Sequence, residues 1–155
     1  MPRAVRATAG TLVALAAAAA GAATGAAAAR GAADQPSAIR AQSEARRQDA
    51  AWGTLYTYYD AETRGTRDGL AAVAVIRPGQ EIHPPHEHAE EEYLMVLEGE
   101  GTWHLKGRER PARAGDMQYA APWDVHGIHN TGRAPLRFVV WKWHSKGVAP
   151  APRPR

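Results

Sequence analysis

The sequence predicts an all-β protein, a small antiparallel jelly-roll barrel. Two observations support this fold class. Short segments rich in Val, Ile, Leu, Tyr and Trp recur from Trp52 onward, and Gly, Pro and Asp residues separate them as turns. Before Trp52 the composition differs, because an alanine-rich stretch is followed by a polar one. We therefore expect one barrel domain over residues 52–146.

Each expected strand has its own pattern. Residues 70–77 form an apolar run, which favours a strand buried on both faces. Residues 136–143 alternate, so that Leu136, Phe138 and Val140 are expected on one face. Lys106-Gly107-Arg108 suits a hairpin turn, since glycine adopts positive φ readily. The expected strands are 55–59, 70–77, 93–97, 101–105, 109–114, 117–120, 126–129 and 136–143.

Residues 1–29 have the features of a secretory signal peptide. Arg3 and Arg6 precede a weakly apolar, alanine-rich stretch, and Ala27-Ala28-Ala29 offers small residues for cleavage. A retained anchor or a disordered leader is the alternative, although Ala and Gly are poor residues for a membrane span. We expect cleavage, which gives a secreted or periplasmic protein without a stable membrane anchor. The chain has no cysteine, which excludes a lipoprotein anchor, disulfides and thiolate ligands.

Three further expectations concern the flanks of the barrel. Residues 30–51 are expected to be a linker and a short helical arm, because 38–51 favours helix but has a thin apolar stripe. The Pro- and Arg-rich residues 147–155 are expected to be disordered. Residues 55–59, as the leading strand, are expected to expose an edge through which a homodimer could form.

The charge balance argues against nucleic acid as a partner. Without Arg3 and Arg6, the 19 Lys and Arg residues fall to 17, against 16 Asp and Glu residues. The mature chain is then close to neutral, and no helix-turn-helix or basic aromatic sheet is evident in the sequence. We expect a small molecule as the partner.

Four side chains carry the strongest chemical signal. His86 and His88 are two residues apart and share a face if that segment is extended. Glu92 follows four residues later, and His126 another 34 residues on. Three imidazoles and one carboxylate suit one divalent transition metal, with Fe, Mn, Ni, Cu and Zn all open.

The spacing around these residues resembles the first motif of the cupin superfamily. That motif reads Gly, five residues, His-x-His, three or four residues, Glu, six residues, Gly. Here Gly79 is followed by six residues, His86-Glu87-His88, three residues, Glu92, six residues and Gly99. One residue is therefore added in the loop, while the spacing between the ligands is kept.

The second cupin motif is also recognisable. It reads Gly, five residues, Pro-x-Gly, two residues, His, three residues, Asn, and here Gly115 precedes Pro122, His126 and Asn130. Pro122 is one place late and the motif's internal glycine is missing, but the distances from Gly115 to His126 and on to Asn130 fit. The resemblance covers residues 70–143 and is to small, single-domain bacterial cupins.

The resemblance implies a double-stranded β-helix barrel that holds the metal with His86, His88, Glu92 and His126. It further implies a small metalloenzyme in which Glu92 could also act as a base, with dioxygenase-like oxidoreductase chemistry favoured and isomerase or lyase chemistry open. The alternatives are a non-catalytic barrel that binds a sugar or organic acid, and a barrel with a purely structural metal.

Other polar and aromatic residues have weaker signals. His129 is an odd offset from His126 and is expected to face away from the metal, while His83 could gate the pocket. Glu90 and Glu91 are interpreted as a solvated charged patch. Ordinary packing or exposure is the alternative for the residues expected at the substrate pocket, which are Tyr93, His104, Tyr119 and Trp123.

Overall fold

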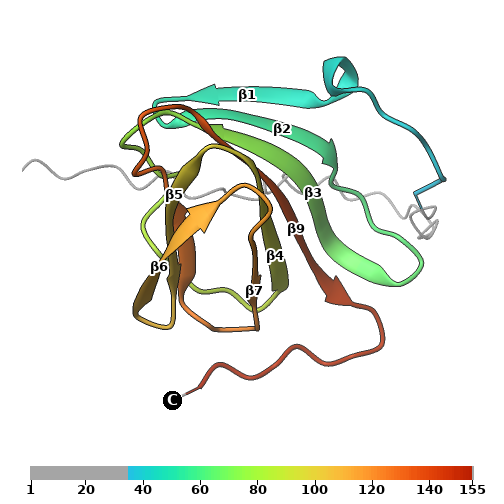
Figure 1. The fold of residues 1–155 in the computed structure, drawn as a ribbon. Coiled ribbons are helices and arrows are strands. Elements are labelled where there is room, and N and C mark those ends of the chain that lie inside the picture. The colour runs from blue at the N-terminus through green and yellow to red at the C-terminus, as the bar shows by residue number, and fades with distance from the viewer. Residues whose placement is uncertain (1–34, 155) are drawn as a thin grey trace, which may run out of the picture. The chain divides into compact units, whose positions relative to one another are not determined.

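The computed structural model describes residues 35–154 (Figure 1). The predicted signal peptide, residues 1–29, lies outside the described residues. Within residues 35–154 no helix is long and apolar enough to cross a membrane. The regular structure of this range consists of one short 3-10 helix and nine strands, so the all-β prediction is confirmed.

The strands form two sheets. The larger sheet has the order β1-β2-β3-β9-β4-β7, and the smaller has the order β6-β5-β8. Figure 1 shows the smaller sheet facing the β9, β4 and β7 part of the larger one. The elements are η1 (Gln42–Glu44), β1 (Arg46–Ala50), β2 (Gly53–Tyr59), β3 (Thr66–Ile76), β4 (Glu91–Glu98), β5 (Glu100–Leu105), β6 (Arg108–Arg113), β7 (Met117–Ala120), β8 (His126–His129) and β9 (Leu136–Ser145).

The core lies between the two sheets and follows the period of two. On β9, Leu136, Phe138 and Val140 are buried, as the alternation predicts. The smaller sheet contributes Trp103 and Ile128 to the same hydrophobic cluster. The other buried members of the cluster are Ala72, Ala74, Ile76, Leu94, Val96 and Ala112. The eight predicted strands therefore correspond to β2–β9, and the hairpin turn has positive φ at both Lys106 and Gly107.

The prediction of a helical arm is wrong for the second half of that segment. Only residues 42–44 of the described arm are helical, and Arg46–Ala50 form β1, paired antiparallel with β2 from Arg46↔Thr57 to Ala50↔Gly53. A hairpin partner adjacent in sequence outweighs a helix propensity that no apolar face supports. The exposed edge expected at 55–59 is thus occupied, and β1 with its charged side chains is the edge instead. The homodimer stays a prediction, but the free edge at residues 55–59 no longer supports it.

Asn130 fixes the end of β8. Its side chain is fully buried, and the amide nitrogen donates to the carbonyl oxygens of Ile76 at 2.8 Å and Ala134 at 2.9 Å. Its side-chain oxygen accepts from the Gly132 N–H at 3.0 Å. A buried amide with these partners is a structural element. The asparagine of the second motif therefore joins β3 to the loop that leads into β9.

Candidate metal centre

A pair of backbone hydrogen bonds joins the loop that carries His86 and His88 to the first residue of β8, His126. The His86 N–H donates to the His126 carbonyl at 3.0 Å, and the His126 N–H donates to the His86 carbonyl at 2.8 Å. Gly127 permits this approach, because a Cβ there would lie 3.3 Å from the Pro85 Cα atom. The segment from Ile82 to Glu90 is otherwise irregular, so the approach of His86 to His88 is set by the loop and not by strand parity.

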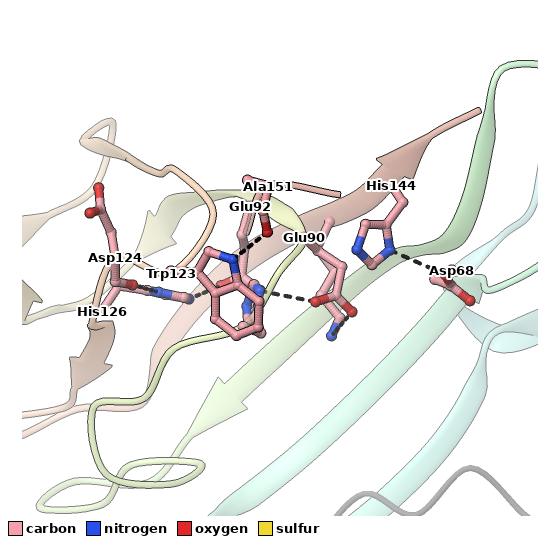
Figure 2. Close-up of polar contacts among 10 residues, drawn as sticks. Asp68, Glu90, Glu92, Trp123, Asp124, His126, His144 and Ala151 are labelled. Atoms are coloured by element: carbon pink, nitrogen blue, oxygen red, sulfur yellow. Dashed lines mark hydrogen bonds and ion pairs between the residues drawn. The ribbon is translucent and has the colours of Figure 1, made fainter. Parts of the chain in front are cut away.

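The three imidazoles converge as the spacing predicts. One ring nitrogen from each of His86, His88 and His126 lies within 4.8 Å of the others. Glu92 lies among them, since its Oε2 is 3.3 Å from His88 Nε2 and its Oε1 is 3.1 Å from His126 Nε2 (Figure 2). Glu92 reaches this position because it shares the inward face of β4 with Leu94 and Val96, which are also buried.

Glu92 is an ionised carboxylate in this setting. Its burial alone would raise the pKa, but the hydrogen bonds and positive charge offered by His126 and His88 outweigh burial and lower the pKa of Glu92 to about 2. The side chain is 9% exposed, so the two imidazoles replace most of its water. The carboxylate is therefore ready to bind a cation at neutral pH.

The histidines differ in protonation. Burial, with the neighbouring His83, His126 and His88 rings, lowers the pKa of His86 to about 4, so this imidazole is neutral at pH 7 and has a free lone pair. Burial also opposes the charge on His126, but the Glu92 carboxylate and the Asp124 carbonyl oxygen outweigh it and raise the pKa of His126. Protons therefore compete with a metal for His126 at a higher pH than they would for an ordinary histidine.

The donor set fits a first-row divalent metal. His86 Nδ1 is buried without a hydrogen-bond partner, which is costly unless the imidazole binds something. The Nδ1 of His126 is hydrogen-bonded to the Asp124 carbonyl at 2.7 Å, and this contact directs Nε2 toward Glu92. Three nitrogens and one carboxylate oxygen would hold the ion, with one or two positions open for water or substrate if the metal prefers five or six ligands.

Two of the residues expected at the substrate pocket lie on the opposite face. Tyr93 is adjacent to Glu92 on β4 and therefore points out of the barrel, where its ring stacks on Trp143 at 5.8 Å. Tyr119 pairs with Tyr93 across β4 and β7, and its hydroxyl is 3.4 Å from the outward Glu91. The expectation that these tyrosines line the substrate pocket is wrong, because strand parity separates them from Glu92.

His104 also faces away from the site. Its neighbour Trp103 belongs to the core, so parity turns His104 outward, where Nδ1 lies 3.4 Å from Glu109 on β6. His129 belongs to β8 at partial exposure, outside the histidine cluster, which agrees with the parity argument. His83 is exposed, and its ring lies edge-on to His86 at 3.9 Å.

Trp123 is the remaining expected pocket residue and lies beside the candidate ligands. Its backbone N–H donates to the His88 carbonyl at 2.8 Å, and it has a positive φ of 68°. Its indole N–H donates to the Ala151 carbonyl at 2.7 Å (Figure 2). Arg153 contacts Glu87 and lies over the indole ring. The tail, expected to be disordered, thus has defined contacts next to the two ligand histidines 86 and 88.

Comparison with known proteins agrees with this geometry. The family described as the cupin domain matches residues 72–142. An oxalate-binding protein of Thermotoga maritima is 34% identical over 71 residues, which are 46% of this chain and 59% of that protein. A polyketide synthase CurC of Streptomyces cyaneus is 33% identical over 101 residues, 64% of this chain and 63% of that protein. The chain thus spans about three fifths of the length of these curated relatives.

Solved structures share the fold. A crystal structure of a predicted oxalate decarboxylase from Thermotoga maritima superposes with a TM-score of 0.61 at 25% identity, covering 68% of this chain and 98% of that chain. A Klebsiella pneumoniae protein with a double-stranded β-helix domain gives a TM-score of 0.57 at 27% identity, covering 76% of this chain and 100% of that chain. The predicted cupin jelly-roll is confirmed.

Replacement of a ligand histidine should abolish tight metal binding. For His86→Ala we expect the Kd for Mn²⁺ or Co²⁺ to rise by more than about 100-fold, beyond the loss typical of residues that only orient a ligand. His129→Ala is the matched control and should stay within about twofold of the wild type, because this ring lies outside the cluster. Isothermal titration calorimetry gives both values. Equal loss in the two variants would refute the assignment.

Metal affinity should fall on acidification from about pH 7.5 to about 5.5, because a proton competes for the same nitrogen. His126 has a raised pKa, so competition begins above the ordinary histidine value of 6.5. His86, with a pKa of about 4, and Glu92, with a pKa of about 2, contribute little in this range. Competition with a chromophoric chelator measures the slope, and a flat affinity over this range would contradict imidazole ligation by His126.

Proposed function

The barrel of this chain is a cupin domain, and from that premise we propose that it binds a divalent transition metal and captures a small organic acid at the metal's open positions. The observation that carries this proposal is the convergence of His86, His88, His126 and Glu92 within the barrel. A chelating acid can occupy two adjacent positions on such an ion. A curated protein and a solved structure, both from Thermotoga maritima, support this ligand class, since their names refer to oxalate.

We propose catalysis as the outcome of this binding, with dioxygenase-like oxidoreductase chemistry favoured over isomerase or lyase chemistry by family analogy. A bound metal would supply Lewis acidity toward a substrate oxygen. The chain's own contribution is to orient three imidazoles and to exclude water around Glu92, which is buried. A pKa of about 2 makes Glu92 a weak base, so its role as a ligand is better supported than its role as a base.

A second candidate is a binder without turnover. One observation favours it: both oxygens of Glu92 are engaged by His126 and His88, so this carboxylate is not free to take up a proton from a substrate. Trp123, which lies next to His88, is in either case the aromatic residue that we propose to contact the ligand.

We also propose that the protein is exported, as the features of residues 1–29 predict. Mass spectrometry of the protein recovered from the producing cells should then show a start near residues 28–32. A full-length chain that begins at Met1 and stays in the cytosolic fraction would overturn this proposal.

Oxalate should bind only to the metal-loaded protein. We expect a calorimetric Kd below about 1 mM for oxalate and at least about tenfold weaker binding of acetate, because acetate cannot chelate through two carboxylates. Oxygen consumption or CO₂ release in the same samples separates the enzyme from the binder. His126→Ala is the control and should bind neither metal nor oxalate. Oxalate binding to the metal-free protein would contradict capture at the metal.

A further inference from the structure

Glu90 is not a solvated charge, as the sequence suggests, but a mostly buried group at the back of the histidine cluster. Its side chain is 18% exposed, and its Oε2 lies 3.2 Å from Nδ1 of His88, which is 14% exposed (Figure 2). On its other side, Oε1 lies 3.5 Å from the Lys142 amino group. Glu90 therefore connects a candidate metal ligand to a cation on β9.

The three consecutive glutamates point to three different environments. Glu92 faces inward to the histidines, and Glu91 faces outward to the Tyr119 hydroxyl. Glu90 precedes β4, in the turn that leaves His88, and this position lets it reach the far nitrogen of that ring. His88 is thereby placed between two carboxylates, with Glu92 3.3 Å from Nε2 and Glu90 3.2 Å from Nδ1.

Lys142 holds Glu90 in place, since its amino group lies 3.5 Å from Oε1 of Glu90. Lys142 pairs with Glu92 in the register of β4 and β9, and it continues the inward face of Phe138 and Val140. Burial raises the pKa of Glu90, but the Lys142 ammonium, a backbone hydrogen bond and the nearby His88 and His144 together outweigh burial and lower this pKa. A buried carboxylate is thus charged at neutral pH and lies beside the imidazole.

The contact between Glu90 and His88 has the distance of an ion pair, but it lacks the alignment of a hydrogen bond, and His88 Nδ1 is buried without another partner. A metal at Nε2 would require the hydrogen of the neutral ring to be on Nδ1, where Glu90 is the carboxylate within reach. This arrangement orients a ligating imidazole and increases its basicity.

We propose that Glu90 is a positioning residue for the metal, that it acts through His88 Nδ1, and that Lys142 anchors it. This inference rests on the proposed metal binding and deepens it. His88 then has a carboxylate partner behind it, whereas His126 has the carbonyl oxygen of Asp124. Because its partner is charged, His88 is expected to bind the metal more strongly than an imidazole whose remote nitrogen contacts a backbone carbonyl.

The test compares Glu90→Gln with Glu91→Gln, the same isosteric change one residue further along the chain. For Glu90→Gln we expect the Kd for Cu²⁺ or Mn²⁺ at pH 7 to rise 10- to 100-fold, whereas Glu91→Gln should stay within about twofold of the wild type. Circular dichroism and thermal melting of the metal-free proteins establish that both variants fold.

A spectroscopic readout separates orientation from general destabilisation. In the Cu²⁺-loaded protein, pulsed electron paramagnetic resonance detects the remote nitrogen of each ligating imidazole, and its quadrupole coupling depends on the hydrogen bond at that nitrogen. We expect Glu90→Gln to change this signal for one imidazole and Glu91→Gln to leave all of them unchanged. Lys142→Met should lower affinity in the same direction by a smaller factor, because Glu90 then keeps its charge but loses its anchor.

The outcomes are separable from failure of the proposed function. If the wild type takes up no metal, the proposed function itself fails. If the wild type binds metal and Glu90→Gln matches Glu91→Gln in both Kd and remote-nitrogen coupling, only the role of Glu90 is overturned. Should Glu90→Gln not fold, Lys142→Met decides, and an unchanged Kd in that variant overturns the inference.

Discussion

The two backbone hydrogen bonds between His86 and His126 are the constraint on which the candidate site depends. They join an irregular loop to the first residue of β8, two segments 40 residues apart in sequence. Gly127 allows Pro85 to approach closely enough for them to form, and Asn130 fixes the other end of β8 against β3. This junction holds the ligands at 86 and 88 next to the ligand at 126.

The strands of the barrel supply the fourth ligand, Glu92, and shield it from water. Glu92 enters from β4, whose pairing with β9 on one side and β7 on the other fixes which residues face inward. Because the same strand faces contribute Leu94, Val96, Phe138 and Val140 to the core, the carboxylate is shielded from water by packing. In such an environment the interactions of Glu92 with His88 and His126 are strong, and they keep it ionised and oriented.

Much of the fold and of the ligand set could be predicted from the sequence, because both follow from period-two alternation and from fixed spacings. The features that could not be predicted are those that depend on which other segments lie beside a residue in the folded chain. Residues 46–50 favour helix locally, and only the hairpin with β2 makes them a strand. Tyr93 begins a predicted strand and is expected at the pocket rim, although parity places its side chain on the other face of β4. Glu90 resembles any charged surface residue until the fold brings His88 and Lys142 to its two oxygens.

The measurement that tests the central claim most directly is the metal content of the protein, purified from residue 32 onward without a metal-affinity tag and analysed by elemental mass spectrometry. The account predicts close to one transition-metal ion per chain, either as purified or after reconstitution at neutral pH and removal of excess metal. A chain that is folded by circular dichroism and yet retains no metal after reconstitution would contradict it.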